Sequence, residues 1–451
     1  MIEIEKQYEM AKRIALEVKR AGGDTYFVGG CVRDFLLGKE SKDVDIEIHN
    51  ISQAELEKVL DSIGTRIEIG KSFGVYNIKG CAIDIALPRK ERLVGVGHRD
   101  FVVGVDPFIG TEAAARRRDF TINAMMRNVL TGEIVDHYSG QQDLKNGVIR
   151  HVCSSSFGED PLRVFRAAQF ASRFNFVLAE ETKSICKTMK VDALSKERVF
   201  EELSKALLKS QKPSVFFEIL REIDMLSVFF PEVEALIGVK QSPLHHSEGD
   251  VWTHTMMVLD EAAKVRDKVA NPIGFMLSAL THDFGKVVTT EFVNGDWHAY
   301  GHEDKGEDIV LTFLKRLANE KKLISYVINM VKLHMKPNAL AGLNASIKST
   351  NKMFDKSVEP LDLVYLALCD SWGKTSPLPF FETETFLFER LKVYKEYMAR
   401  EYVTGKDLID SGLTPNENFS LVLEYAHKLR LVGVSKESAL KQALSYARKL
   451  K

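Results

Sequence analysis

The sequence predicts an α+β protein, with a small mixed or antiparallel sheet in the N-terminal part and helices through the rest. Short apolar runs of the kind found in strands stop near residue 154. Helical periodicity accounts for the roughly 300 residues that follow. This change of pattern places a domain boundary near residue 150 and predicts further, all-helical domains after it.

The composition narrows the class of protein. A length of 451 residues suggests two to four domains, and a hydrophobic content of 45% is enough for sizeable cores. The net charge of −1 does not indicate nucleic-acid binding, so any such binding depends on a local basic face. No signal peptide or membrane-spanning apolar run occurs, so we expect no membrane partner. The five cysteines form no C-x-x-C pair, which predicts a cytoplasmic protein without a cysteine zinc site.

The expected elements of the N-terminal part follow one another closely. Residues 3–20 have the periodicity of an amphipathic helix. Ser52 and Glu55 have the spacing of a capping box at the start of the next long helix. Strands are expected at residues 65–69, 75–80 and 81–87. Residues 88–110 are rich in charge and glycine and lack periodicity, so we expect a long irregular segment there.

The stretch Tyr26–Ile48 carries the most informative pattern, a strand, a glycine turn, a short helix and a second strand. Asp43 and Asp45 stand two apart on the second strand and therefore share a face. Neighbouring carboxylates repel each other unless a cation lies between them, and Mg²⁺ prefers such oxygen ligands. Gly29 and Gly30 allow a phosphate to approach the backbone, and Arg33 adds a positive fork. Together these residues predict a phosphoryl-transfer site.

Further residues extend this site. Asp84 lies between apolar residues of a predicted strand and would complete a metal and general-base cluster, although a strand residue facing water is the alternative. Arg118, Asp119 and Asn123 lie in the stretch ARRRDFTINAM, which is interpreted as the start of a helix. An arginine pair at such a position can hold a triphosphate or ribose, whereas a solvated basic turn is the alternative.

Asp160 and Arg163 lie three apart at the start of a predicted helix and therefore share a face. An aspartate accepts from an exocyclic amine, and an arginine donates to a ring nitrogen. Cytosine and adenine both present this pattern, whereas uracil and guanine do not, so one such pair can select C and A. An ion pair between the two side chains on the helix surface is the alternative.

A second constellation consists of histidines and aspartates on separate predicted helices: His254, His282, Asp283, His302, His334 and Asp370. Imidazole with carboxylate suits divalent metals, including transition metals, and such a site activates water against a phosphate ester. The arrangement resembles the HD superfamily of metal-dependent phosphohydrolases, matched by His254, His282–Asp283 and Asp370. His302 and His334 would be additional ligands or phosphate contacts.

Three segments, in order, resemble the class II tRNA nucleotidyltransferases, the CCA-adding enzymes, a family that also includes bacterial poly(A) polymerases. They are VGGCVRDFLLG with KDVDI, RRRDFTINAM and FGEDPLRVFRAAQF, and the segment VTGKDLI also occurs in that group. The resemblance covers nearly the whole chain when the HD domain of the bacterial enzymes is included.

The resemblance implies a head at residues 1–150, a neck at 151–212, a body at 213–395 and a tail at 396–451. The HD domain would occupy about residues 245–375 of the body, and the basic helical tail would contact tRNA, although a solvated helix face is equally compatible with its charge. The chain would add C, C and A to the 3′ end of tRNA without a template and release pyrophosphate. The HD site would remove phosphate from 2′,3′-cyclic or 2′- or 3′-phosphorylated ends.

The resemblance also implies roles for particular residues. Mg²⁺ would bind to Asp43 and Asp45, and ATP or CTP would bind to Gly30, Arg33 and Arg118. Arg166 would read the incoming base together with the Asp160–Arg163 pair.

Alternatives remain open from the sequence. The chain departs from the family pattern at Gln169 and Phe200, where arginine is frequent, and in the loop at 88–110. A partial CC- or A-adding enzyme or a poly(A) polymerase is therefore the first alternative. A phosphohydrolase whose head only binds RNA is the second, and a non-catalytic RNA-binding helical protein is the third. The oligomeric state cannot be predicted.

Overall fold

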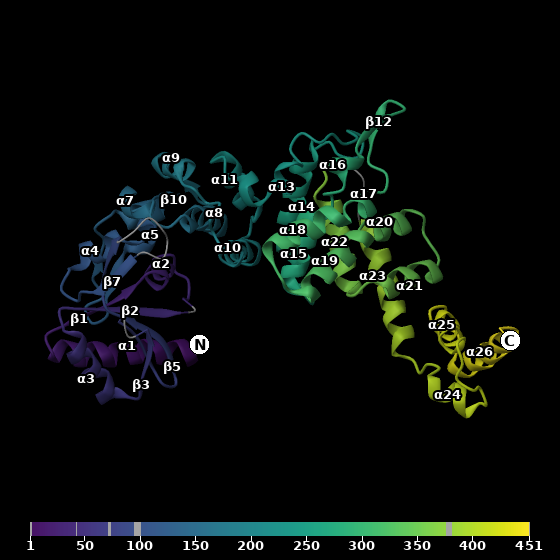
Figure 1. Cartoon of the computed structure of the whole chain (residues 1–451), viewed down its shortest axis with the longest axis horizontal. Helices are drawn as coiled ribbons and strands as arrows, with labels where there is room; N and C mark the ends of the chain where they lie inside the picture. The colour runs from purple at the N-terminus through teal and green to yellow at the C-terminus, as the bar shows by residue number, and fades with distance from the viewer. Residues whose placement is uncertain (1, 42, 71–73, 94–100, 376–380, 451) are drawn as a thin grey trace. The chain divides into compact units, whose positions relative to one another are not determined.

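The computed structural model describes residues 2–41, 43–70, 74–93, 101–375 and 381–450 (Figure 1). The chain divides into two compact units. The first contains Met1–Glu202 and Val215–Met225, and the second contains Leu203–Ser214 and Leu226–Lys451. Among the described residues, no helix combines the length and the apolar character needed to cross a membrane. The predicted α+β class is confirmed, since a sheet occupies the first unit and helices dominate the second.

A seven-stranded sheet forms the centre of the first unit, in the order β3-β4-β5-β2-β1-β8-β9. The strands are β1 (Asp24–Val28), β2 (Val44–His49), β3 (Arg66–Gly70), β4 (Val75–Ile78), β5 (Cys81–Ala86), β8 (Met126–Asn128) and β9 (Ile134–Val135). Strands β2 and β5 pair in parallel, and the other neighbouring strands pair antiparallel. The sheet is therefore mixed, as the sequence predicts.

Helices pack against this sheet and make up the rest of the first unit. Helix α1 (Ile2–Arg20) buries Ala11, Ile14, Ala15 and Val18. Helix α3 begins with the predicted capping box, in which the Ser52 and Glu55 side chains bond each other's backbone N–H groups. The helices of this unit after α1 are α2 (Gly30–Leu36), α3 (Gln53–Ile63), α4 (Thr111–Arg116), α5 (Thr121–Ala124), α6 (Gly140–Asn146), α7 (Ser154–Phe157), α8 (Leu162–Phe174) and α9 (Glu180–Thr188). Helix α10 (Lys196–Lys209) begins in this unit, and α11 (Ser214–Glu222) falls almost wholly within it.

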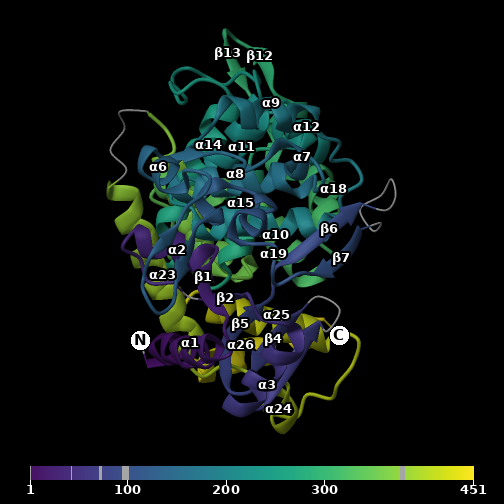
Figure 2. The same cartoon turned by 90° about the vertical axis from the view of Figure 1, so that its left-hand side faces the viewer.

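The segment 88–110 differs from the prediction. Two of its parts are regular, because β6 (Arg89–Leu93) and β7 (Phe101–Val105) pair antiparallel in register from Arg89↔Val105 to Leu93↔Phe101 (Figure 2). Residues 94–100, between them, lie outside the described residues. These two strands pair outside the main sheet, and their sequence lacks the apolar alternation that signals a strand.

Two other predictions need correction. The residues Arg117–Phe120 do not open a helix but connect α4 to α5. Strands also continue beyond residue 154: β11 (Val177–Leu178) pairs with β10 (Val148–Ile149), and β12 (Glu291–Val293) pairs with β13 (Asp296–His298). These strands have two or three residues each, too few to show a period of two in the sequence.

The second unit is helical apart from the β12–β13 hairpin, which Figure 1 shows at its upper edge. Helices α14, α15, α19 and α22 pack against one another. The helices that precede or form this bundle are α12 (Leu226–Phe229), α13 (Pro231–Glu234), α14 (Val251–Val265), α15 (Pro272–Thr281), α16 (Lys286–Thr289), α17 (His302–Lys305), α18 (Glu307–Leu317), α19 (Lys321–Leu333), α20 (Met335–Gly342), α21 (Ile347–Lys356), α22 (Pro360–Trp372) and α23 (Phe381–Ala399).

The C-terminal helices have a small core of their own. They are α24 (Gly405–Asp410), α25 (Phe419–Arg430) and α26 (Lys436–Lys449). Leu408, Val422 and Ala443 are buried within this core, and the rings of Tyr425 and Tyr446 stack at 4.4 Å. The predicted helical character of this region is confirmed.

A buried carboxylate holds the helical bundle together at one point. Asp362, at the start of α22, is fully buried and accepts from the backbone N–H groups of Ala270 and Asn271 and from the Tyr326 hydroxyl at 2.6 Å. Burial and this hydrogen bond to Asp362 raise the pKa of Tyr326, so the hydroxyl remains a donor.

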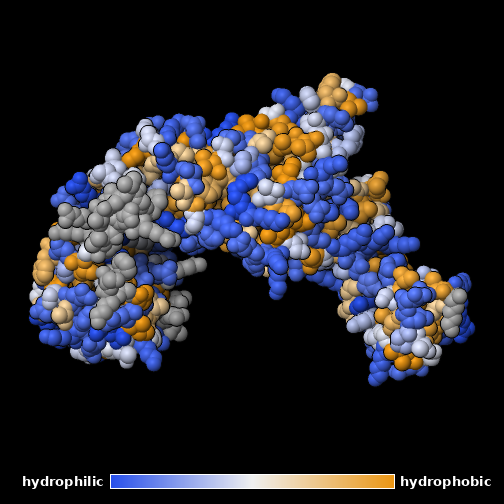
Figure 3. Space-filling model, in the orientation of Figure 1, coloured by the Kyte–Doolittle hydropathy of each residue, from blue (hydrophilic) through white to orange (hydrophobic). Residues whose placement is uncertain are grey.

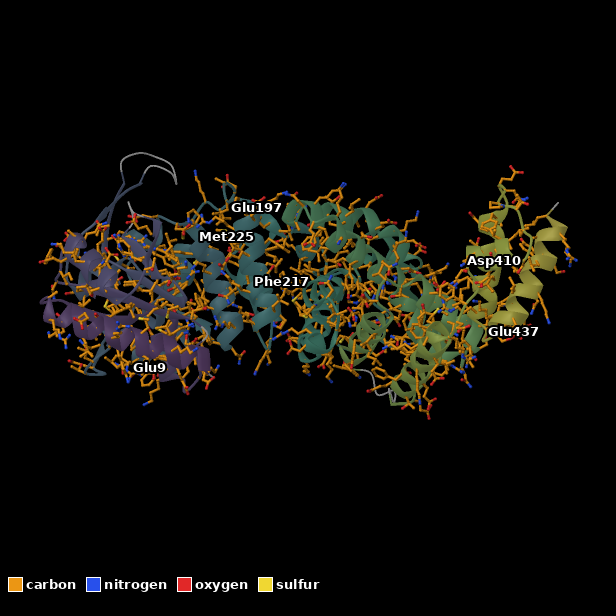
Figure 4. The ribbon with its side chains drawn as sticks, turned by 90° about the horizontal axis from the view of Figure 1, so that it is seen from below. Glu9, Glu197, Phe217, Met225, Asp410 and Glu437 are labelled. Atoms are coloured by element: carbon orange, nitrogen blue, oxygen red, sulfur yellow. The ribbon has the colours of Figure 1, made fainter. Side chains whose placement is uncertain are left out.

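We predict that Asp362→Ala destabilises the second unit by roughly 3 kcal/mol, because it leaves three buried donors without an acceptor. Chemical denaturation of the purified variant measures this loss. Asp410→Ala is the matched control, since Asp410 is exposed on α24 (labelled in Figure 4). Equal free energies of unfolding for the two variants would refute the assignment.

Candidate active sites

The first candidate site is the carboxylate site, formed by Asp43, Asp45 and Asp84. The parallel pairing of β2 and β5 sets Asp45 directly opposite Asp84. Asp43 directly precedes β2 and is exposed, Asp45 is half-buried, and Asp84 is exposed. Buried Ile83 and Ile85 flank Asp84, so the alternation of β5 turns its carboxylate away from the core.

The charges of this site repel one another. Burial and the neighbouring Asp84 raise the pKa of Asp45 to about 6, Asp43 acts in the same direction, and Arg118 opposes them. A bound divalent cation would relieve this repulsion, so the donor set fits such an ion. Among the described residues, no three histidine, cysteine, aspartate or glutamate side chains here bring ligand atoms within 4.8 Å of one another. Two carboxylates would therefore share the ion with oxygens of the substrate, as is common for Mg²⁺.

The glycine turn lies between a carboxylate and a guanidinium. Gly29 has a φ of 71°, in the left-handed region that favours glycine. A Cβ added there would lie 3.3 Å from Nη1 of Arg118 and 3.9 Å from Oδ2 of Asp45. A Cβ at Gly30 would lie 3.4 Å from Nη2 of Arg33. The turn thus leaves open the space into which an anionic group between Asp45 and Arg118 would fit.

Four predicted nucleotide-binding residues form one buried hydrogen-bond network with Asp34. Arg33 donates to Asp34 Oδ1 through Nε and Nη2 and to Asn123 Oδ1 through Nη1 at 2.6 Å. Asn123 donates to Asp119 at 3.1 Å, and Arg166 donates to the other oxygen of Asp119 at 2.8 Å. Burial alone would raise the pKa of Asp119, but Arg166 and Asn123 hold it below its usual value. The network connects α2, α5 and α8.

The Arg33 guanidinium also lies against two aromatic rings of α8. Its Cζ is 4.7 Å from the ring centre of Phe174 and 5.4 Å from that of Phe170. Arg33 is only 3% exposed, and burial lowers its pKa below the usual arginine value. Its contacts therefore fix the position of α8 against the glycine turn, and direct phosphate binding by Arg33 stays a prediction.

Asp160 and Arg163 do not pair with each other. Asp160 accepts from Nη2 of Arg198, on α10, at 3.1 and 3.2 Å. Arg163 donates to the backbone carbonyls of Ser156 and Arg117 at 2.6 and 2.9 Å. The surface ion pair that was the alternative to base recognition is therefore absent, and base recognition itself stays a prediction.

The sequence reasoning missed Glu47 and His49. Glu47 is 1% exposed and faces the same side of β2 as Asp45. One carboxylate oxygen lies 3.0 Å from Nε2 of His49, and the other accepts from Nη2 of Arg118 at 3.4 Å. Burial would raise the pKa of Glu47, but His49 and Arg118 lower it to about 2. The signal was present, since D-V-D-I-E continues the alternation of the two aspartates.

The second candidate site is the histidine cluster, in which all six predicted residues come together in the second unit. Each is at most 5% exposed. Nε2 of His254 lies 3.1 Å from Asp370, and Nε2 of His302 lies 3.2 Å from Asp283. His282 and Asp283, expected on a helix, instead directly follow the last residue of α15.

Three imidazoles of the cluster are oriented in the same way. His282, His302 and His334 each direct Nδ1 to the backbone carbonyl three residues earlier, at 2.6–2.9 Å. A carbonyl only accepts, so Nδ1 carries the proton and Nε2 presents a lone pair. The Nε2 atoms of His302 and His334 face each other at 3.2 Å. Facing lone pairs at this distance, with Nδ1 tied to a carbonyl, are the arrangement of metal-ligating histidines.

Neighbouring groups hold the two aspartates of the cluster in their charged form. Burial would raise the pKa of Asp283, but His282 and Lys286 lower it well below its usual value. Burial would also raise the pKa of Asp370, but Lys374 lowers it well below its usual value. The lysine Nζ atoms lie 2.7 Å from Asp283 and 3.2 Å from Asp370. Neither lysine was assigned from the sequence, although each ends a W-G-K or F-G-K segment next to an assigned aspartate.

The cluster provides several sets of ligand atoms suited to a divalent ion. Within the described parts of the chain, three sets lie within 4.8 Å: His254–His282–Asp370, Asp283–His302–His334 and His246–Glu248–His254. His246 and Glu248 were not predicted. Glu248 lies 3.0 Å from Nδ1 of His254 and so orients that ring. Nitrogen and carboxylate donors in this number fit a divalent metal.

Known protein families match three separate parts of the chain. Family models match residues 25–150 (Poly A polymerase head domain), 175–237 (Probable RNA and SrmB-binding site of polymerase A) and 251–371 (HD domain). The chain is 39% identical to the Multifunctional CCA protein of Nitrosococcus oceani over 69% of this chain and 74% of the relative. It is also 39% identical to the Multifunctional CCA protein of Xanthomonas euvesicatoria, over 86% of this chain and 93% of that relative.

A solved structure shows the same fold. The Thermotoga maritima CCA-adding enzyme complexed with tRNA has a TM-score of 0.64 at 21% identity, covering 97% of this chain and 95% of that one. A polymerase head domain followed by an HD domain defines the class of nucleotidyltransferases with an attached HD domain. The chain belongs to the family of multifunctional CCA proteins. The resemblance drawn from the sequence motifs is confirmed, and both domain classes imply a divalent metal.

We predict that the histidine cluster retains a divalent metal through purification. His302→Ala or Asp370→Asn should lower its affinity by at least about 100-fold, because each removes a ligand. Elemental mass spectrometry of the full-length protein measures the bound metal. A chelator should also lower the melting temperature of the wild type, since the ion binds only the folded state.

His427→Ala is the control for these variants, since His427 pairs with Asp355 at the protein surface. The assignment is wrong if His302→Ala and His427→Ala carry the same amount of metal.

Proposed function

We propose that the head adds C, C and A to the 3′ end of tRNA from CTP and ATP, with release of pyrophosphate. The observation that carries this proposal is the parallel register that sets Asp45 opposite Asp84, beside the Gly29 turn and Arg118. The names of the relatives and the tRNA complex of the structural neighbour support the same substrate. The proposal includes the division into head, neck, body and tail at residues 150, 212 and 395. It also includes a cytoplasmic location, which the five free cysteines support because disulfides are rare in that compartment.

The residues of the head have distinct tasks in this reaction. The Gly29 turn and Arg118 bind the triphosphate, and Asp84 accepts the proton of the terminal hydroxyl of the tRNA. The hydroxyl oxygen bonds to the α-phosphorus, and the bond from the α-phosphorus to the bridging oxygen breaks, so pyrophosphate leaves. Mg²⁺ held by Asp43 and Asp45 supplies charge compensation for the phosphates when it is bound.

Selection of the base falls to the start of α8. Asp160 accepts from the exocyclic amine of cytosine or adenine, and Arg163 donates to the adjacent ring nitrogen. Arg166, Asp119 and Asn123 hold this helix against the head through the buried network. A wrong base would leave buried polar groups unpaired, which lowers the affinity of the site for that base.

We also propose that the histidine cluster hydrolyses phosphate esters at 2′,3′-cyclic or 2′- or 3′-phosphorylated RNA ends. A divalent metal supplies Lewis-acid chemistry there when bound, and the imidazole donors also suit a transition metal. Lys286 and Lys374 compensate the charge of the phosphate, and their Nζ atoms already lie beside the two aspartates. The buried histidines provide metal ligands in a site largely shielded from bulk water.

A pair of variants separates the two activities. Asp45→Ala should lower nucleotide addition by about 10²–10³-fold or more and leave phosphohydrolysis unchanged, because charge compensation in the head is lost. Asp283→Ala should do the reverse. Sequencing the 3′ ends of truncated tRNA incubated with CTP and ATP, separately and together, measures the first activity.

The same assay distinguishes the products. Addition of C, C and A supports the proposal, whereas addition of C alone, A alone or long A runs would replace it with a partial enzyme or a poly(A) polymerase. Unchanged addition by Asp45→Ala contradicts the assignment of the carboxylate site.

A further variant tests the part played by Glu47. Glu47→Gln keeps the shape but removes the charge that holds the Arg118 guanidinium, so we predict that KM for CTP and ATP rises by roughly tenfold. Steady-state kinetics on truncated tRNA measures this, with Glu112→Gln, an exposed glutamate of α4, as control. If Glu47→Gln folds normally and its KM equals that of the control, Glu47 does not position Arg118.

A further inference from the structure

A cavity of about 660 Å³ opens beside the histidine cluster. Part of its lining is charged and belongs to the cluster, including Asp283, Lys286, His302, Asp370 and Lys374. The rest of the lining includes Trp297, Tyr300, Met335 and Ala339. The volume lies in the range of small-ligand sites, so the cavity is larger than a phosphate group alone requires. Its lining thus combines a charged part with aromatic and apolar side chains, and polar residues such as Gln241 and Ser242 complete it.

The aromatic part of the lining comes from the β12–β13 hairpin and the residues after it. The hairpin sets Trp297 opposite Phe292, and their rings meet edge to face at 5.1 Å. The rings of His298 and Tyr300 stack at 5.1 Å with an interplanar angle of 8°. Tyr300 is nevertheless 70% exposed. A large aromatic ring that is stacked on one side and open to solvent beside a cavity is suited to stack on a planar ligand.

The hairpin region also exposes apolar side chains. Figure 3 shows hydrophobic side chains gathered at its end. Phe292 is 59% exposed, and Val288, on the preceding helix α16, is 64% exposed. Ser242, which also lines the cavity, donates a hydrogen bond to Asp296 of the hairpin. The hairpin is thus tied to the cavity rather than being a free loop.

One residue that lines the cavity has a polar atom without a partner. Oδ1 of Asn338, on α20, is buried and has no hydrogen-bond partner among the described residues. The amide nitrogen of the same side chain donates to the carbonyl of Ala367 at 2.8 Å, which fixes the orientation of the amide. A buried acceptor without a donor costs stability unless a ligand supplies one. A ribose hydroxyl or an exocyclic base amine is a donor of the required kind.

We propose that this cavity is a nucleoside subsite, in which the ring of Tyr300, supported by His298, stacks on the base of the nucleotide whose phosphate meets the histidine cluster. This inference rests on the proposed phosphohydrolase function and names the part of the substrate that sets its specificity. Asn338 accepts a hydrogen bond from the nucleoside, and Lys286 and Lys374 lie on the side of the phosphate. An ester without a base would use only the charged part of the lining.

The test compares two cyclic esters in the full-length, metal-loaded protein. Adenosine 2′,3′-cyclic phosphate carries a base, and glycerol 1,2-cyclic phosphate does not. Tyr300→Ala should lower kcat/KM for the adenosine ester by about tenfold, as expected for the loss of one base stack, and leave the glycerol ester unchanged. Tyr300→Phe should retain both activities. Leu343→Ala, an equally exposed apolar residue at the end of α20, is the control.

Binding gives a readout independent of hydrolysis. Adenosine 3′-monophosphate, measured by titration calorimetry, should bind about tenfold more weakly to Tyr300→Ala than to the wild type and to Leu343→Ala. If the wild type hydrolyses neither ester, the phosphohydrolase proposal fails, whereas the binding difference still decides the subsite. Equal losses on both esters, or unchanged binding of the monophosphate, would overturn the nucleoside subsite.

Discussion

The parallel pairing of β2 with β5 is the constraint on which the first site depends. All other pairs in the main sheet are antiparallel, and α3 with the β3–β4 hairpin carries the chain across so that β5 runs beside β2 in the same direction. The alternation of buried isoleucines on both strands fixes the register, because a slip of one residue would turn Asp84 into the core. The facing carboxylates, and the raised pKa of Asp45, follow from that register.

The histidine cluster combines a local device with long-range packing. In His282 and His334 the carbonyl that accepts from Nδ1 belongs to the last turn of the preceding helix, where backbone carbonyls lack helical partners. The same bond therefore satisfies the helix end and directs Nε2 inward. Packing of α14, α15, α19 and α22 then brings these ends together. Lysines within four residues of the aspartates keep the buried carboxylates charged, so stability and metal affinity depend on the same contacts.

Sequence reasoning succeeded where the signal was local. The capping box of α3, the amphipathic α1 and the helix that carries Arg163 were predictable from residue spacing alone. It failed for the β6–β7 ribbon, which pairs outside the main sheet and whose sequence does not alternate between apolar and polar residues. It also missed Glu47 and Lys374, because the alternation that includes Glu47 and the position of Lys374 after Asp370 do not by themselves show which groups these side chains contact.

The amino-acid sequence by itself determined the family and the α+β class, and it predicted most of the candidate site residues, because motifs and periodicity are properties of short stretches. Only the tertiary structure decided which of these side chains meet. It joined Asp160 to Arg198 rather than to Arg163, set Asp45 opposite Asp84, and placed Tyr300 beside the histidine cluster. Such pairings depend on strand register and helix packing between residues far apart in the chain, and no local pattern encodes them.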